Sequence, residues 1–236
     1  MNLILLTKED LSPDGLTAEI RGHKLKHITQ IHKAKLDQEL TVGILNGNVG
    51  KGKVLEVRED LIRMNISLTL SPPPPLPLTL IVALPRPKTL KKVIHAAVSM
   101  GAKRIIFIES WKVDKSYWKS PVLTSGEIEE QCHLALEQSK DTVMPEISLK
   151  RRFKPFVEDE LSELIRGTLP FVAHPYNATP CPTGLKEEVT LAIGPEGGFT
   201  DYEIESFKKL NFQVITLGER ILRVEFAACS LLSKIF

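Results

Sequence analysis

Short apolar runs alternate with amphipathic segments from residue 78 to residue 236, and this alternation constrains the fold more than any other feature of the sequence. The runs have the length of strands, and the segments between them repeat apolar residues at helical spacing. Strands that alternate with helices form a largely parallel sheet that is covered on both faces. We therefore predict an α/β fold for this region. The predicted strands are 78–84, 104–110, 146–149, 168–174, 189–194 and 212–218, and the predicted helices are 87–102, 126–140, 155–167, 201–210 and 225–236.

Four consecutive prolines, Pro72–Pro75, separate that region from the residues before it. Prolines remove backbone donors and favour a stiff extended chain, so we predict a rigid spacer here rather than a strand. The preceding residues predict a small β-barrel interrupted by one basic helix. The expected strands are 3–6, 16–20, 39–46, 52–59 and 61–70. The domains expected from this pattern are 1–71, a linker at 72–77, and 78–236.

The composition is that of an ordinary globular chain, with 42% hydrophobic and 25% charged residues. No run approaches the roughly 20 apolar residues that a membrane helix requires, and the N-terminal apolar run is too short for a signal peptide. We therefore expect a cytoplasmic protein with no membrane partner. The three cysteines lie far apart and form no CxxC or Cys/His ligand spacing, so we expect neither a disulfide framework nor a metal site.

The formal net charge of the whole chain is only +2, but positive charge is concentrated in two segments. Residues 21–35 contain five lysines or arginines and no acid, and a second basic cluster occupies 150–154. Such clusters suit a phosphate backbone, and a solvated helix face accounts for them equally well. The candidate RNA contacts in the first cluster are Arg21, Lys24, Lys26 and Lys33.

A glycine-rich turn, AIGPEGGFTDYE at 192–203, joins a predicted strand to a predicted helix. Its three glycines permit close approach or positive φ, and Thr200 and Glu203 have the spacing of a capping box. A strand, glycine loop and helix in this order form a small-molecule site, with a purely structural turn as the alternative. Glu196 in the loop disfavours a pyrophosphate and favours a ligand with hydroxyls or positive charge, such as S-adenosylmethionine.

A second loop at a strand end, LGERILRVE at 217–225, combines apolar and arginine side chains. The apolar side chains are suited to wall an adenine, and the arginines to face an anionic partner. Carboxyl ends of parallel strands meet at one edge of a sheet, so we expect this loop and the glycine loop to converge on one pocket.

The paired motifs GPEGGF and LGxRILRxE resemble those of the ribosomal RNA small subunit methyltransferase E family, in the SPOUT superfamily. The resemblance extends over nearly the whole chain, through LNGNVGKG, LPRPKTLKKVIHAAVSMGAKRIIFIES, LEQSKDTVMPEI and AHP. One position departs from the pattern, because Phe226 stands where the family usually has threonine. This chain therefore has no hydroxyl at that position.

That resemblance implies a SPOUT-type parallel sheet with a trefoil knot, a PUA-like N-terminal barrel and a homodimer. It implies S-adenosylmethionine as the methyl donor, and N3 of a uridine in the 16S rRNA of the small ribosomal subunit as the acceptor. The residues that it assigns to the cofactor site are Ala173, His174, Gly194, Glu196, Gly197, Gly198, Leu217, Gly218, Ile221 and Leu222.

Uracil N3 becomes nucleophilic only as its proton leaves and negative charge spreads onto the flanking oxygens. We assign stabilisation of that charge to Arg223. Its alternative role is to bind a phosphate of the RNA. Glu225 is the candidate base, and His174 is a second candidate. In the alternative role, Glu225 only caps the last helix or places a negative charge at its N-terminus. Arg220 is a further candidate RNA contact.

Two other interpretations compete with this one. The first is a SPOUT methyltransferase acting on tRNA or another rRNA site, and the second is an RNA-binding module that has lost catalysis. The intact glycine and arginine loops argue against the second, because a pure binder needs no cofactor pocket. The aromatic and basic loop WKVDKSYWKS, at 111–120, stays unassigned between base stacking, a dimer interface and packing over the core.

Overall fold

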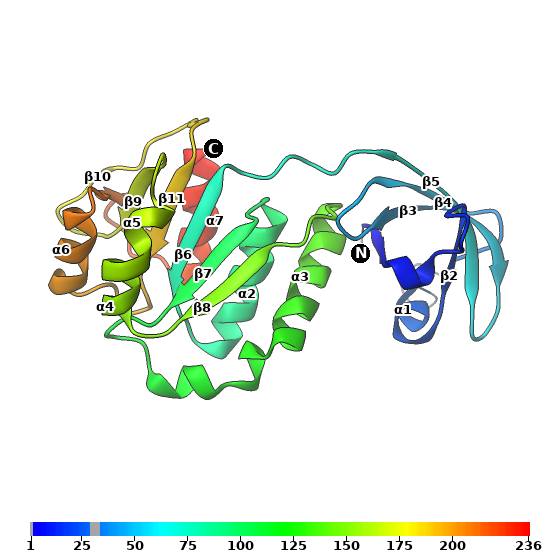
Figure 1. The fold of residues 1–236 in the computed structure, drawn as a ribbon, viewed down its shortest axis with the longest axis horizontal. Coiled ribbons are helices and arrows are strands. Elements are labelled where there is room, and N and C mark those ends of the chain that lie inside the picture. Colours follow the sequence, from blue (N-terminus) through cyan, green and yellow to red (C-terminus); the bar gives the residue numbers. More distant parts are fainter. Residues whose placement is uncertain (1, 29–33) are drawn as a thin grey trace. The chain divides into compact units, whose positions relative to one another are not determined.

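The structure is a computed structural model that describes residues 2–28 and 34–236 (Figure 1). The chain divides into two compact units. The first comprises Met1–Pro73 with His133–Met144, and the second comprises Pro74–Cys132 with Pro145–Phe236. Residues 71–77 carry neither helix nor strand, as the proline run predicted.

The first unit is built on a five-stranded mixed sheet in the order β1-β3-β4-β5-β2. Only the β1–β3 pair is parallel, and the other pairs are antiparallel. Inward-facing apolar side chains from these strands and from the helix α1 form one core. The elements are β1 (Ile4–Leu6), η1 (Lys8–Asp10), β2 (Thr17–Ile20), α1 (Gly22–His27), β3 (Glu39–Ile44), β4 (Val49–Val57) and β5 (Ile62–Leu70).

A later segment of the chain completes this unit. The backbone N–H groups of Asn2 and Leu3 donate to the carbonyl oxygen of Glu137 at 3.1 and 3.0 Å. Asn46 donates to the carbonyl of Thr142 at 2.8 Å. These bonds satisfy backbone groups beside the paired strands β1 and β3. The N-terminal unit therefore depends on residues more than 130 positions away, which no local pattern revealed.

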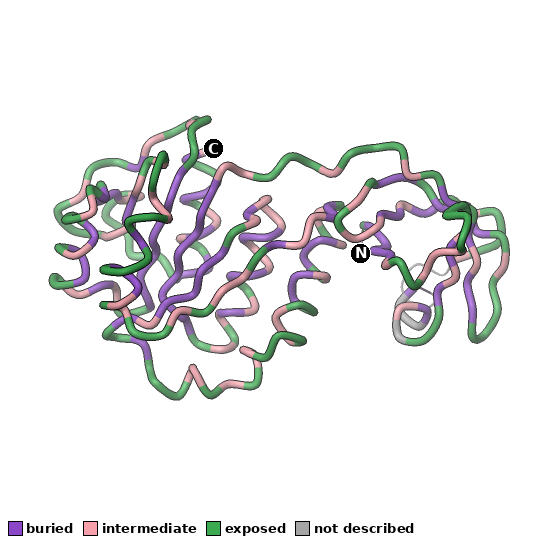
Figure 2. The backbone as a smooth tube through the Cα atoms, in the orientation of Figure 1, coloured by how far each residue is buried: buried purple, intermediate pink, exposed green. Residues whose placement is uncertain are grey.

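The second unit is the α/β fold that the alternation predicted. Its seven strands are all parallel, in the order β10-β12-β9-β11-β6-β7-β8. The buried strands at its centre are purple in Figure 2. The strands are β6 (Leu78–Ala83), β7 (Arg104–Ile108), β8 (Glu146–Lys150), β9 (Leu169–Ala173), β10 (Thr179–Pro180), β11 (Val189–Ile193) and β12 (Gln213–Thr216).

Helices cover both faces of this sheet, as expected for buried parallel strands. Figure 1 shows α2 (Pro87–Ser99) and α7 (Val224–Ile235) on one side and α6 (Asp201–Lys209) on the other. Helix α3 (Ser125–Ser139) follows two 3₁₀ turns, η3 (Lys115–Lys119) and η4 (Pro121–Leu123). Within the described residues, no helix combines the length and the apolar character needed to cross a membrane.

The segment predicted as one helix at 155–167 is helical, but it is not a single regular α-helix. The segment consists of α4 (Phe153–Pro155), a π-helical segment (Phe156–Glu160) and α5 (Leu161–Leu164). Phe156 and Leu161 are both buried and lie five residues apart, a spacing that a π turn brings to one face and an α turn does not. The two-residue strand β10 was not predicted, because its pairing with β12 is not visible in a sequence this short.

Candidate active site

A cavity of about 340 Å³ opens at the carboxyl edge of the parallel sheet. Four loops line it, those that follow β7, β9, β11 and β12, together with the start of α7. A cavity of this size is typical of a small-molecule site. The lining includes all ten residues that the family resemblance assigned to the cofactor: Ala173, His174, Gly194, Glu196, Gly197, Gly198, Leu217, Gly218, Ile221 and Leu222.

The loop after β11 turns sharply because two of its glycines have no side chain. A Cβ atom on Gly194 would lie 3.0 Å from the backbone nitrogen of Phe199, too close for an ordinary contact. Gly198 has φ +67°, in the left-handed region that favours glycine, and its N–H donates to the carbonyl of Pro195 at 2.8 Å. The loop therefore brings bare backbone to the cavity wall.

The predicted capping box at the start of α6 is confirmed. The Glu203 carboxylate accepts from the backbone N–H of Thr200 at 2.8 Å, and the Thr200 hydroxyl accepts from the N–H of Glu203 at 3.3 Å. Glu203 is only 2% exposed, and its second oxygen accepts from the backbone N–H of Trp111 at 2.8 Å. A buried carboxylate needs such donors, so Glu203 joins the glycine loop to the loop that follows β7.

Lys112 belongs to the loop that follows β7, and it lines the cavity. Its Nζ donates to the carbonyl oxygen of Gly197 at 2.8 Å. Lys112, Tyr176 and Asp201 are lining residues that sequence reasoning did not assign to the cavity. The signal that could have found Lys112 is its place just after a strand of the same parallel sheet.

The cavity presents both signs of charge beside apolar walls. Lys112 and Arg220 are its cations, and Glu196 and Asp201 are its anions. Ile221 and Leu222 are both exposed apolar side chains on the same loop. Exposed apolar groups at a concave site are typical of ligand binding. The arrangement suits a ligand that combines a flat apolar group with positive and negative charges.

Glu196 also has a partner outside the cavity. Its carboxylate accepts from the backbone N–H of Arg86 at 3.2 Å, at the N-terminal end of α2. A carboxylate is favoured there by the helix dipole and by the free N–H groups of the first turn. Glu196 therefore anchors the glycine loop to α2 as well as lining the cavity.

His174 sits at the end of β9, where its backbone N–H donates to the carbonyl of Ile215 at 3.0 Å. Burial lowers the pKa of its imidazole, so the ring is neutral at neutral pH. Its Nδ1 atom is buried and has no hydrogen-bond partner among the described residues. The ring packs edge-on to Tyr176, with centroids 5.8 Å apart.

The two candidate catalytic residues lie at the start of α7, beside the cavity. Arg223 is the N-cap residue and its side chain is exposed. Glu225 is 7% exposed, and its carboxylate lies 3.4 Å from the Nζ of Lys92. The cavity lining includes Val224 and Ala227 but neither Arg223 nor Glu225.

The candidate RNA contacts of the first unit are partly neutralised by acids. Arg21 pairs with Glu19 at 3.1 Å and with Asp60 at 3.5 Å, and Lys24 pairs with Asp10 at 2.7 Å. The backbone of Lys26 lies in α1, but its side chain is not among the described ones. Lys33 lies outside the described residues.

Comparison with known proteins identifies the family. A model of the RNA methyltransferase domain family matches residues 72–236. The Ribosomal RNA small subunit methyltransferase E of Treponema pallidum is 25% identical over 98% of this chain and 88% of its own length. The protein of the same name from Mesomycoplasma hyopneumoniae is 32% identical over 65% of this chain and 66% of its own length.

A solved structure shows the same fold. The Ribosomal RNA small subunit methyltransferase E from Neisseria gonorrhoeae, crystallised with S-adenosyl methionine, superposes with a TM-score of 0.74. It is 20% identical, and the match covers 98% of this chain and 95% of that one. The matched residues 72–236 contain the cavity and both motifs that carried the resemblance in the sequence. The chain therefore belongs to the RNA methyltransferase family.

Proposed function

We propose that the protein transfers a methyl group from S-adenosylmethionine to N3 of a uridine in the 16S rRNA of the small ribosomal subunit. The observation that carries this proposal is the cavity, because all ten residues assigned to the cofactor line it. The relatives that match over most of the chain are named as methyltransferases of small-subunit ribosomal RNA, and a structural neighbour holds S-adenosyl methionine.

The cavity residues fit this methyl donor chemically. Leu217, Ile221 and Leu222 are apolar groups against which adenine would pack. The backbone of the glycine loop supplies polar groups for the ribose, and the charged residues around it complement an amino acid moiety. S-adenosylmethionine supplies an electrophilic methyl group when bound. The protein's own contribution is then to hold the acceptor in line with that group.

Arg223 and Glu225 are the residues that we assign to the acceptor. Arg223, exposed at the N-terminus of α7, stabilises the charge that develops on the uracil oxygens as N3 loses its proton. Glu225 accepts that proton, and His174 is the second candidate because its imidazole is neutral at neutral pH. Nearby Lys92 would hold the Glu225 carboxylate in place.

Three variants separate these roles. Arg223→Ala is expected to lower kcat at saturating RNA, and Glu225→Gln is expected to do so more steeply than His174→Gln. Normal kcat with only weaker RNA binding in Arg223→Ala would overturn the electrostatic role and leave a phosphate contact. Loss of activity in His174→Gln with normal kcat in Glu225→Gln would move the base to His174.

The residues that we assign to RNA contacts are Arg21, Lys24, Lys26 and Lys33 in the first unit and Arg220 in the second. Arg220 lies at the cavity, so it contacts the RNA near the reacting base. The other four would bind phosphates from a PUA-like domain at 1–71, joined by the linker 72–77 to a methyltransferase domain at 78–236. Neutralising them together should weaken RNA binding and flatten its salt dependence while leaving cofactor affinity unchanged. If the salt dependence of RNA binding did not change, these residues would be solvated surface residues that do not contact RNA.

The proposal extends to a trefoil knot, a homodimer and a cytoplasmic location. The strand order supports a knot, because β12 lies on the far side of β9 from β11, and the next helix α7 returns to pack on β11 and α2. Sedimentation equilibrium would test the homodimer. A cytoplasmic location follows from the proposed ribosomal substrate.

The deciding experiment incubates the purified protein with labelled S-adenosylmethionine and either naked 16S rRNA or isolated small subunits. Digestion to nucleosides should yield labelled 3-methyluridine from at least one of the two substrates. Label in another nucleoside, or transfer to tRNA in preference to both, would overturn the assignment. Calorimetry should detect cofactor binding in the absence of RNA, and its absence would overturn the enzymatic function.

A further inference from the structure

The loop that follows β7 places a tryptophan in solvent beside the cavity. The side chain of Trp111 is 85% exposed, although its neighbours Ser110 and Val113 are buried. Its backbone N–H is held by the buried Glu203, and Lys112 next to it reaches the carbonyl of Gly197. A large apolar ring is therefore held outward on an anchored loop, next to a loop that lines the cavity.

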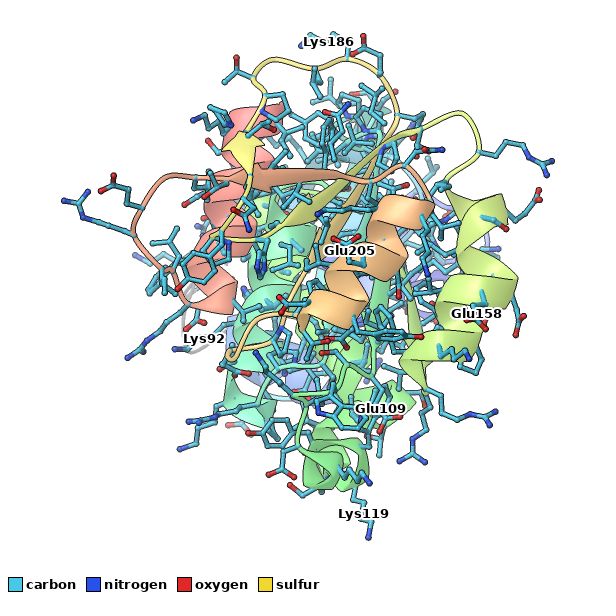
Figure 3. All side chains as sticks on the ribbon, turned by 90° about the vertical axis from the view of Figure 1, so that its left-hand side faces the viewer. Lys92, Glu109, Lys119, Glu158, Lys186 and Glu205 are labelled. Atoms are coloured by element: carbon cyan, nitrogen blue, oxygen red, sulfur yellow. The ribbon has the colours of Figure 1, made fainter. Side chains whose placement is uncertain are left out.

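Trp111 belongs to one of two strongly cationic segments of the chain. Residues 111–120 and 150–154 together contain seven lysines or arginines and one acid, Asp114. The two segments leave the same edge of the sheet, because β7 and β8 are paired with Ile108 opposite Lys150. Figure 3 shows Lys119 projecting into solvent at this end of the unit, with Lys186 at the opposite end.

Direct contacts join the two segments. The guanidinium of Arg151 lies over the ring of Trp118, 5.4 Å from its centroid, and the backbone N–H of Arg152 donates to the Glu109 carboxylate at 2.9 Å. Lys150 and Lys154 are paired with Glu160 and Glu158. Within the described part of the chain, Arg151 and Arg152 have no ion pair with a carboxylate, and both are exposed. Their charges are available to a ligand.

Arg152 has φ +67°, a left-handed conformation that costs a non-glycine residue energy. Such strain persists where the surrounding structure imposes it and is found most often at functional sites. Here the backbone bond to Glu109 holds it. The bond fixes the backbone from which the exposed Arg152 side chain projects.

We propose that Trp111, Lys115, Trp118, Lys119, Arg151 and Arg152 form a surface that binds unpaired RNA, with a base stacked on Trp111 and phosphates bound by the cations. We name it the Trp111 surface. Aromatic rings that alternate with cations are suited to single-stranded nucleic acid, because every base has a face to stack and every nucleotide a charge. This inference rests on the proposed function, and it names the part of the second unit that holds RNA flanking the reacting uridine.

Binding of a labelled single-stranded oligouridylate of about 15 nucleotides to the full-length protein tests the surface. Trp111→Ala should lower the affinity about 5- to 150-fold, whereas Trp111→Phe retains a ring and most of the affinity. Arg151→Ala and Arg152→Ala should each reduce the slope of log affinity against log salt by about 0.7. Lys186→Ala, at the opposite end of the unit, is the charge control and should leave both quantities unchanged.

Fluorescence reads the stacking directly. The chain has two tryptophans, so Trp118→Phe leaves Trp111 as the only one, and its emission should be quenched when the oligonucleotide binds. Unquenched emission, or unchanged affinity in Trp111→Ala, overturns the proposal. A Trp111→Ala protein that becomes monomeric but binds RNA with unchanged affinity also overturns it and identifies a subunit interface.

Calorimetry with S-adenosylmethionine separates this proposal from the proposed function. The Trp111→Ala protein should bind the cofactor with the affinity of the parent. If the parent binds no cofactor, the enzymatic function fails whatever Trp111 does. If the parent binds cofactor and the variant binds RNA unchanged, only the Trp111 surface is wrong.

Discussion

The carboxylate of Glu203 accepts a hydrogen bond of 2.8 Å from the backbone N–H of Trp111, 92 residues earlier in the chain. The same carboxylate completes the capping box of α6 with Thr200. One buried acid therefore holds together the glycine loop, the first turn of α6 and the loop that carries the exposed tryptophan. Its loss should loosen the cavity and the Trp111 surface together.

Glu203→Ala should destabilise the protein by roughly 2 to 4 kcal/mol. Loss of the capping box costs about 1 kcal/mol, and an unsatisfied N–H at Trp111 costs about 1 to 3 kcal/mol more. Urea denaturation gives the change in the free energy of unfolding. The control is Glu205→Ala on the exposed face of α6 (Figure 3), where a change within about 0.5 kcal/mol is expected. Equal effects of the two substitutions would show that the Trp111 and Thr200 contacts are dispensable.

Gly198→Ala should destabilise the protein by about 1 to 2 kcal/mol and weaken S-adenosylmethionine binding. A Cβ atom there meets nothing within 4 Å, so the cost is the left-handed backbone at φ +67° alone. Gly126→Ala is the matched control, since its Cβ also meets nothing but its φ is not positive and it lies in α3. That substitution should stabilise the protein by up to about 1 kcal/mol. The same sign for both would contradict the backbone explanation.

Acidification should destabilise the parent protein more than it destabilises His174→Gln. Burial lowers the pKa of His174 below its ordinary value of 6.5, so the unfolded chain binds more protons as the pH falls through that value. The stability that His174 contributes is therefore present above pH 6.5 and is lost progressively below it. Free energies of unfolding measured on both sides of that pH give the slopes.

The comparison isolates His174 because other titrating groups are common to both proteins. Burial raises the pKa of Glu137, and that carboxyl contributes a slope of the opposite sign. Its effect cancels in the difference between parent and variant. Identical slopes in the two proteins would mean that the imidazole takes up its proton as easily in the folded protein as in the unfolded chain.

Cys132 should react slowly with iodoacetamide in the folded protein. Burial raises the pKa of its thiol from 9.0 to about 11, which reduces the thiolate at a given pH about 100-fold. Mass spectrometry of the peptide, with urea-unfolded protein as the reference, measures the ratio of rates. A ratio near one would place Cys132 in contact with solvent and contradict the packing around α3.

The sequence reached the α/β class because that class depends on local periodicity. Each strand of the parallel sheet was predicted to within a few residues, apart from β10, which has only two. The π-helical segment at Phe156–Glu160 was not predicted, since its five-residue spacing reflects the packing of Phe156 and Leu161 in the core. Local propensity holds no information about such packing.

The sequence by itself determined the glycine loop and the capping box of Thr200 and Glu203, because these depend on short spacings. It also assigned ten residues to the cofactor, through motifs that resemble those of a known family. Only the tertiary structure decided that Lys112 donates a hydrogen bond to the carbonyl of Gly197, and that Glu203 accepts one from the backbone N–H of Trp111. The reason is the strand order, in which β6 alone separates β7 from β11. Loops more than 80 residues apart thereby leave one edge of the sheet as near neighbours, and their side chains meet there.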